Sequence, residues 1–290
     1  MKKIVINSPF RWAGSKKKLL NEMLETMFVR NKNNYIEPFL GSGIVLLNVI
    51  NNSEELGYKK YYVNDINKNI IEFYKLLKTD VTYILNIIEE VAAKYNDLDI
   101  DEQKEMYYRI REEFNNSENN KCINFYFLMK TGFNGVYRVN SSGKFNVPFG
   151  KKTKIFVDRN LFLKLSQLIQ NVEFYNLPYQ EFMEIMKTNK IINNSFIYCD
   201  PPYIPDDDSV YQKQMLYTKS EFNHQELYNF FVDKNISDVM ISMSESKIAD
   251  SIYMKKPFEK KVIKDILRVV NPKKLFSSKE IAYINYKIEK

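Results

Sequence analysis

An apolar run at residues 195–199 leads directly into Asp200, Pro201, Pro202 and Tyr203. The run is typical of a buried strand, and two consecutive prolines cannot continue a strand, so the chain must enter a rigid, extended loop. In α/β folds, the loops at the carboxyl ends of the strands form the binding sites. This segment therefore predicts both the fold class and the place of a site.

The loop suits reactions of a weakly nucleophilic amino group attached to an aromatic ring. The Asp200 carboxylate and the Pro201 carbonyl can accept hydrogen bonds from the two N–H groups, which draws the nitrogen lone pair out of conjugation. Tyr203 can stack on the ring, and the proline prevents its carbonyl from moving. A strand-terminating turn capped by an aspartate also fits these residues, because short motifs recur by chance.

A second loop carries glycines between a predicted strand and a predicted helix. Gly41 and Gly43 allow a ligand to approach backbone N–H groups, although Leu46 replaces the third glycine of the dinucleotide fingerprint. Asp65 ends the next predicted strand, close to the position where an acid holds ribose hydroxyls. The glycines alone fit a plain packing loop equally well, but together with Asp65 they favour a nucleoside-containing cofactor.

Strand and helix alternate at both ends of the chain, and a run of helices separates the two parts. The simplest architecture is one α/β domain over 1–75 and 160–290, interrupted by a helical insertion over 76–159 with a hairpin at 131–151. We predict strands over 35–37, 60–64, 172–175, 195–199, 238–243, 262–268 and 281–287. We predict helices over 16–29 (capped by Ser15), 44–50, 67–78, 81–95, 102–114 and 121–130.

Composition narrows the classes of function. The 290 residues include 43 Lys and Arg against 36 Asp and Glu, and the net charge of +7 favours a polyanionic partner without requiring one. Cys122, Cys199 and the single histidine, His224, argue against structural zinc and histidine-dependent catalysis. We expect His224 at a helix surface or cap, and the three aspartates at 206–208 in a solvated loop rather than a metal site. Without a signal-peptide pattern or a long apolar run, we expect a cytoplasmic protein.

Several segments, taken in order, resemble the motifs of the Dam-type, alpha-group DNA adenine-N6 methyltransferases. Five motifs in the same order are much more specific than any one of them, and the resemblance covers nearly the whole chain. Ser15 departs from the pattern, since the family usually has a second glycine there, and Arg11 stands where lysine is common. The segments are 10–16, 37–43, 64–67, 133–150 and 200–203, with weaker similarity at 217–218, 241–242 and 277–283.

The resemblance implies a Rossmann-like S-adenosylmethionine-dependent methyltransferase sheet with an inserted helical DNA-recognition domain that bears a β-hairpin. S-adenosylmethionine would lie across the carboxyl edge of the sheet, with Asp65 at the ribose and Asp200 beside the methyl donor. No metal is implied. Trp12 would lie near the methionine, although the lone tryptophan also fits a buried anchor. The implied cofactor residues are Trp12, Lys16, Glu37, Pro38, Phe39, Gly41, Gly43, Asp65 and Asp200.

The family counterpart of the hairpin enters the DNA, so we expect Arg138 to read a guanine through its O6 and N7 atoms. Arg138 and Arg11 also fit phosphate contacts or surface ion pairs. Phe133 and Asn134 would contact the gap that a flipped adenine leaves. The residues expected at the DNA are Arg11, Phe133, Asn134, Val136, Arg138, Asn140 and Pro148.

These implications converge on direct methyl transfer from S-adenosylmethionine to N6 of an adenine flipped out of duplex DNA, in GATC or a related site. Asp200, Pro201, Pro202 and Tyr203 would form the catalytic pocket, where Asp200 takes a proton or only accepts hydrogen bonds. A methyltransferase acting on RNA or a protein amide, and a catalytically silent DNA-binding protein, are the alternatives. We expect double-stranded DNA as the partner, association with the nucleoid through that DNA, and a monomer.

Overall fold

The computed structural model describes residues 5–29, 31–204, 222–271 and 274–288. The expected acidic loop at 206–208 and the weak motif at 217–218 lie outside these residues. In the part of the chain that is described, no helix is both long and apolar enough to cross a membrane.

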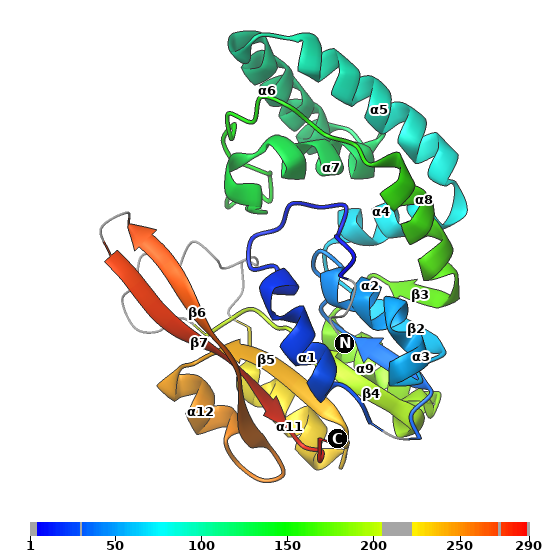
Figure 1. The fold of residues 1–290 in the computed structure, drawn as a ribbon, viewed down its shortest axis with the longest axis vertical. Helices are drawn as coiled ribbons and strands as arrows, with labels where there is room; N and C mark the ends of the chain where they lie inside the picture. Colours follow the sequence, from blue (N-terminus) through cyan, green and yellow to red (C-terminus); the bar gives the residue numbers. More distant parts are fainter. Residues whose placement is uncertain (1–4, 30, 205–221, 272–273, 289–290) are drawn as a thin grey trace.

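A seven-stranded sheet with the order β3-β2-β1-β4-β5-β7-β6 forms the lower part of the molecule (Figure 1). The first five strands along the chain run parallel to one another, and the seventh runs antiparallel to its two neighbours, the fifth and the sixth. From β1 the chain proceeds outward to β2 and β3, then returns to place β4 on the other side of β1. This reversal makes the carboxyl ends of β1 and β4 the topological switch point, where open α/β sheets bind ligands. The strands are β1 (Asn34–Glu37), β2 (Lys60–Asn64), β3 (Val172–Tyr175), β4 (Ser195–Cys199), β5 (Val239–Ser244), β6 (Glu259–Asn271) and β7 (Lys274–Ile284).

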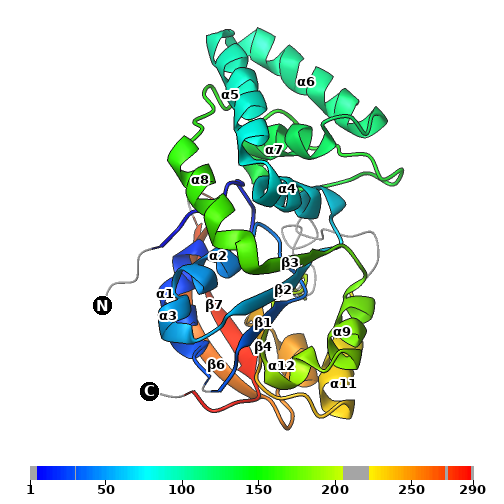
Figure 2. The ribbon, with the colours of Figure 1, turned by 90° about the vertical axis from the view of Figure 1, so that its right-hand side faces the viewer.

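Helices cover both faces of the sheet (Figure 2). One face carries α1 (Leu20–Thr26), α2 (Ile44–Asn51), α3 (Ser53–Leu56) and α8 (Arg159–Leu168), and the other carries α9 (Tyr179–Thr188), α11 (His224–Asp233) and α12 (Lys247–Tyr253). Side chains alternate between these faces along each strand. In β4, for example, Phe196 and Tyr198 belong to the core beneath α1 and α2, whereas Ile197 and Cys199 belong to the core beneath α9 and α11. The structure thus confirms the α/β class with a Rossmann-like sheet.

Four helices form the upper part of the molecule in Figure 1: α4 (Lys68–Thr79), α5 (Val81–Asp97), α6 (Ile100–Asn116) and α7 (Lys121–Thr131). Their predicted ranges are confirmed to within two residues at either end. Asp99 and Glu102 form a capping box that starts α6, as the sequence pattern of an acid before an amphipathic helix favours. The apolar core runs without a break from Leu47 on α2 through Phe73 on α4 to Phe125 on α7.

The segment over 131–151 folds back on itself, but the two regular strands predicted there are wrong. Only two isolated antiparallel bridges occur, Gly132 with Phe149 and Val139 with Phe145. Side chains of α6 bind the backbone that a strand would use: Asn115 bonds both the N–H and the carbonyl of Phe145, and Tyr107 and Arg111 both donate to the Val147 carbonyl. Pro148 has no N–H to offer a ladder. The hairpin is therefore an irregular loop fastened to a helix.

Two further predictions need correction. Ser15 makes no side-chain capping bond, because a 3₁₀ turn at Lys16–Leu19 replaces the first α-helical turn, and α1 ends at Thr26 rather than at Val29. The strands predicted over 262–268 and 281–287 are longer and shifted: β6 and β7 pair with each other along a ribbon that projects beyond the sheet (Figure 1). This pairing stabilises strand residues that have no apolar alternation of their own.

Candidate active site

Three carboxylates lie on the same face of the sheet near its carboxyl edge. Glu37 ends β1, Asp200 follows β4 directly, and Glu280 lies in β7. Period-two alternation places them on the face of α1 and α2, since Tyr35, Tyr198 and Ala282, two residues from each, pack in that core. Glu37 is 1% exposed and Glu280 6%. Buried acids are costly unless partners satisfy them, so such a cluster marks a site.

Lys16 is the cation at this cluster. Its Nζ lies 2.6 Å from Asp200 Oδ2, and its side chain is buried. Burial raises the pKa of Asp200, whereas the adjacent Lys16 charge and hydrogen bond oppose that rise. The second carboxylate oxygen, Asp200 Oδ1, is buried and accepts no hydrogen bond from the residues that the structure describes. One oxygen of Asp200 is thus bound by Lys16, and the other has no donor among the described residues.

Tyr203 is held at two points. The Lys16 ammonium lies 4.8 Å from the centroid of the Tyr203 ring, within the range of a cation–π contact. The Tyr203 hydroxyl donates a hydrogen bond of 2.8 Å to Glu280 Oε2. Pro201 is buried and Pro202 half-buried, so the predicted rigid loop connects Asp200 with a fixed aromatic ring.

Glu37, at the end of β1, is buried and shielded from solvent by its neighbours. The Tyr35 hydroxyl donates to its Oε2 at 2.9 Å. Burial raises the pKa of Glu37 far above its ordinary value, and the neighbouring Asp200 and Asp65 charges add to the rise, while Tyr35 and Lys16 oppose it. Pro38 is buried behind it, and the Phe39 ring packs against Tyr179 with centroids 5.3 Å apart.

Asp65 holds the glycine loop. Its Oδ2 accepts the Gly41 N–H at 2.7 Å, and its Oδ1 accepts the Asn67 N–H at 2.8 Å. Burial raises the pKa of Asp65 to about 6. A side chain at Gly41 would meet the Trp12 indole nitrogen at 3.5 Å, so Trp12 faces this loop. At Gly43, φ is +71° and a Cβ would lie 2.4 Å from the Tyr74 hydroxyl, so only glycine fits there.

The amino-terminal loop meets the turn at Phe133–Gly135, although more than a hundred residues separate them. The Ala13 N–H bonds the Gly135 carbonyl at 2.9 Å, and the Arg11 guanidinium reaches the Gly132 carbonyl at 3.5 Å. Phe133 is 53% exposed, and Asn134 has the left-handed φ of 52°. Arg11, Phe133 and Asn134 therefore form one surface beside Trp12 and Lys16.

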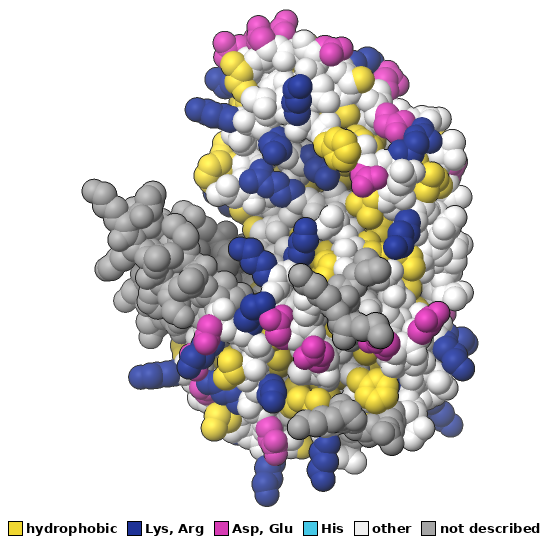
Figure 3. Space-filling model, viewed as in Figure 1, with side chains coloured by type: hydrophobic (Ala, Val, Ile, Leu, Met, Phe, Trp, Pro, Cys, Tyr) yellow, Lys and Arg dark blue, Asp and Glu magenta, His cyan; other side chains and the backbone are white. Residues whose placement is uncertain are grey.

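Arg138 lies exposed farther along the same loop. Its Nε donates to Asn146 Oδ1 at 2.8 Å, which fixes the direction of the guanidinium. Asn140 shapes the tip, since its Oδ1 accepts the N–H groups of Ser142 and Lys144. Val136 is half-buried and Pro148 exposed. In Figure 3, Lys and Arg side chains gather across the middle of the face where the helical part meets the sheet, and Asp and Glu lie mostly above and below.

Glu280 was not predicted as a site residue. It directly precedes the continuous apolar run over 281–284, and this acid at the start of such a run was the available signal. The expectation for His224 as a surface residue is wrong: it is buried, and its Nδ1 lies 2.9 Å from the Tyr253 hydroxyl. Burial lowers the pKa of His224 to about 4. Among the described residues, no group of three or more His, Cys, Asp or Glu side chains is arranged to hold a metal ion.

Comparison with known proteins identifies the family of this chain. Residues 12–269 match the family model of the D12 class N6 adenine-specific DNA methyltransferases. The chain belongs to this family. It is 33% identical over 277 residues to the Type II methyltransferase M.MjaIII of Methanocaldococcus jannaschii, with 88% of this chain and 92% of that protein covered.

Two bacterial relatives of this D12 methyltransferase match a shorter stretch. The DNA adenine methylase of Escherichia coli K12 is 30% identical, and that of Vibrio cholerae is 32% identical. Each match extends over 197 residues, which is 67% of this chain and 64% of the relative. The resemblance read from the motifs is thus confirmed, as is the class of enzyme.

Proposed function

We propose that this D12 methyltransferase transfers the methyl group of S-adenosylmethionine to N6 of an adenine flipped out of duplex DNA. In this proposal, Asp200 Oδ1 accepts a hydrogen bond from the adenine amino group. The observation that carries this proposal is the difference between the surroundings of the two carboxylate oxygens of Asp200. Lys16 binds Oδ2, whereas Oδ1 is buried and has no hydrogen-bond donor in the described part of the chain. A buried acceptor without a partner is costly, and the exocyclic amine of adenine supplies the missing donor.

The chemistry of the cluster fits the cofactor. S-adenosylmethionine supplies an electrophilic methyl group on a cationic sulfonium, and it carries an ammonium group as well. Asp200 and Glu280 together outnumber Lys16 on this face, so a cationic ligand is favoured there. Asp65 would accept the ribose hydroxyls, and Trp12 would border the cofactor together with Phe39, Pro38, Gly41 and Gly43.

Asp200 and Pro201 would activate the amine without forming a covalent bond to it. Hydrogen bonds from N6 to the Asp200 carboxylate and the Pro201 carbonyl strengthen as the nitrogen becomes tetrahedral. As the N–CH₃ bond forms and the S–CH₃ bond breaks, the amine becomes cationic and releases one proton. Because burial raises the pKa of Asp200, its carboxylate is a better proton acceptor than an ordinary aspartate.

The helical part would recognise the DNA. We assign residues 76–159 to the target-recognition insertion, and residues 1–75 and 160–290 to catalysis by a monomer. Arg138 and Arg11 would read bases, assisted by Asn140, Val136 and Pro148, while Phe133 and Asn134 would contact the gap left by the adenine. The basic face in Figure 3 would bind phosphates. We propose GATC or a close relative as the site.

The test uses purified protein, duplex DNA and S-adenosylmethionine with a labelled methyl group. We expect label on adenine N6, loss of transfer in Asp200→Asn, and DNA affinity unchanged in that variant. Asp238→Asn is the matched control, since Asp238 also pairs with a lysine, Lys32 at 2.8 Å, but lies before β5 at the opposite edge of the sheet. Normal transfer by Asp200→Asn would refute the role of Asp200. Sequencing of methylated adenines in a host that expresses the chain identifies the site.

A further inference from the structure

Glu280 is a buried carboxylate to which the activity proposed above assigns nothing beyond its negative charge. It lies opposite Ser244 of β5 and Lys264 of β6 in the strand register, and its side chain shares the face of Ala282 and the apolar core. Burying an acid there costs free energy that an apolar residue would not cost. Glu280 accepts a hydrogen bond of 2.8 Å from the Tyr203 hydroxyl, so this buried acid contacts the loop proposed to be catalytic.

We infer that Glu280 is a positioning residue: it fixes the Tyr203 ring through the hydroxyl, and so sets the surface on which the target adenine stacks. Tyr203 has two rotatable side-chain bonds, and without a bond to its hydroxyl the ring would lose the contact that fixes its tip, leaving the Lys16 contact at 4.8 Å and the packing against the core beneath α9 and α11. With Glu280 the ring is held between an anion at its tip and a cation over its face. The inference rests on the proposed function, because it names the residue that orders that same site.

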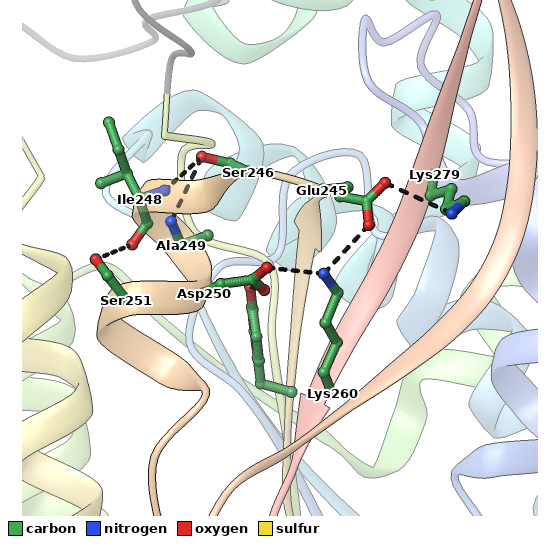
Figure 4. Close-up of polar contacts among 9 residues, drawn as sticks. Glu245, Ser246, Ile248, Ala249, Asp250, Ser251, Lys260 and Lys279 are labelled. Carbon is green, nitrogen blue, oxygen red and sulfur yellow. Dashed lines mark hydrogen bonds and ion pairs between the residues drawn. The ribbon is translucent and has the colours of Figure 1, made fainter.

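The strand that carries Glu280 is itself fastened at this point. Figure 4 shows Lys260 between two acids, with its Nζ 3.2 Å from Glu245 and 2.8 Å from Asp250. Lys279, next to Glu280, lies 3.9 Å from Glu245, and its carbonyl accepts the Glu245 N–H at 2.9 Å. The Lys279 contacts bind β7 to the residue that follows β5, and the Lys260 contacts bind the paired strand β6 to Glu245 and to α12. Glu280 therefore lies on a rigid support rather than on a loose ribbon.

Glu280 has a second, electrostatic effect that separates its role from plain packing. Burial is the main cause that raises the pKa of Asp200, and the negative charge of Glu280 contributes to the rise, against Lys16. Removing this charge therefore lowers the pKa of Asp200. If methyl transfer needs ionised Asp200, the acid limb of the pH–rate profile must move to lower pH when Glu280 is neutral.

The experiment measures kcat, the KM for DNA and the pH–rate profile for Glu280→Ala, Glu280→Gln, Tyr203→Phe and the double variant Glu280→Ala/Tyr203→Phe. Glu280→Ala and Tyr203→Phe should each lower kcat by about tenfold, the scale of one hydrogen bond to a charged group, with little change in KM. The double variant should be no worse than either single variant, because both remove the same bond. Glu280→Gln keeps an acceptor for the hydroxyl, so it should recover most of kcat while the acid limb moves to lower pH.

Tyr283→Phe is the matched control. Tyr283 is also a buried tyrosine that donates to a carboxylate, Asp250 at 2.7 Å, but it lies on the opposite face of β7. It should unfold at a temperature similar to that of Tyr203→Phe and retain the wild-type kcat. Losses that multiply in the double variant, or a Glu280→Gln variant as slow as Glu280→Ala with an unmoved pH profile, would overturn the inference. Absence of DNA adenine methylation by the wild-type chain would instead overturn the proposed function.

Discussion

Lys16 and Asp200 are 184 residues apart in the chain, and their side chains meet at 2.6 Å. The contact joins the amino-terminal loop to the end of β4, so the segment that borders the proposed cofactor position also controls the charge of the proposed acceptor. Since Lys16 also lies over the Tyr203 ring, one buried ammonium connects three parts of the site.

Replacing Lys16 by methionine should shift the pH dependence of methyl transfer. Burial already raises the pKa of Asp200, and the loss of the opposing Lys16 charge and hydrogen bond raises it further. Less Asp200 is then ionised at neutral pH, so the acid limb should move to higher pH and kcat should fall by about tenfold to a hundredfold. Lys17→Met, at the exposed neighbouring position, should leave the profile in place. An unmoved acid limb in Lys16→Met would show that the ion pair does not control Asp200.

Cofactor affinity should weaken as the pH falls below about 6, the pKa to which burial raises Asp65. Above that pH the carboxylate is ionised and can accept the ribose hydroxyls, whereas below it the protonated form loses acceptor capacity. Trp12 is the only tryptophan in the chain and faces Gly41, so its fluorescence reports binding directly. A titration with S-adenosylmethionine between pH 5 and 8 checks this. Asp65→Asn should bind more weakly and without the pH step; a step that persists would assign it to another group.

Gly135→Ala should impair DNA binding far more than Gly143→Ala. Both glycines have left-handed φ values, +61° and +76°, so both variants bear a similar backbone strain of about 1–2 kcal/mol. Only at Gly135 would the new Cβ strike backbone, 2.9 Å from the Arg11 carbonyl oxygen, and push the amino-terminal loop off the recognition turn. Fluorescence anisotropy with duplex DNA compares the two variants, and equal affinities would contradict the packing of these loops as a recognition surface.

Arg138→Lys should relax sequence discrimination more than it weakens binding. Lysine cannot make the bidentate contact to guanine, and that contact is worth about 1–3 kcal/mol of discrimination. The ratio of kcat/KM between the cognate duplex and single-base variants should therefore fall by roughly fivefold to a hundredfold at one position. Lys144→Ala, at an exposed position on the same loop, should weaken binding to all sequences alike and reduce the salt dependence. A uniform loss in Arg138→Lys would identify Arg138 as a phosphate contact.

The parallel strands were predicted to within one residue, because each is a short apolar run between polar segments. The amphipathic helices α4 to α7 were predicted nearly as well, since their apolar positions recur with the helical period. The prediction of regular strands over 131–151 failed because backbone groups there form hydrogen bonds with Asn115, Tyr107 and Arg111. These three residues lie on α6, which no local sequence pattern connects with the segment. The bounds predicted for β7 were wrong for the same reason, because pairing with a partner strand, and not a pattern in its own residues, determines where β7 begins and ends.

The sequence by itself determined the local chemistry of this protein. The acid and the two prolines after an apolar strand specify a rigid loop, and the order of the motifs specifies the family, since both depend on residue types and short spacings. Only the tertiary structure decided that Lys16 binds one oxygen of Asp200 and that Glu280 holds Tyr203. Strand order decides those contacts: β5 and then β7 follow β4 across the sheet, and an acid on one strand reaches a loop on another only when the sheet brings their ends together.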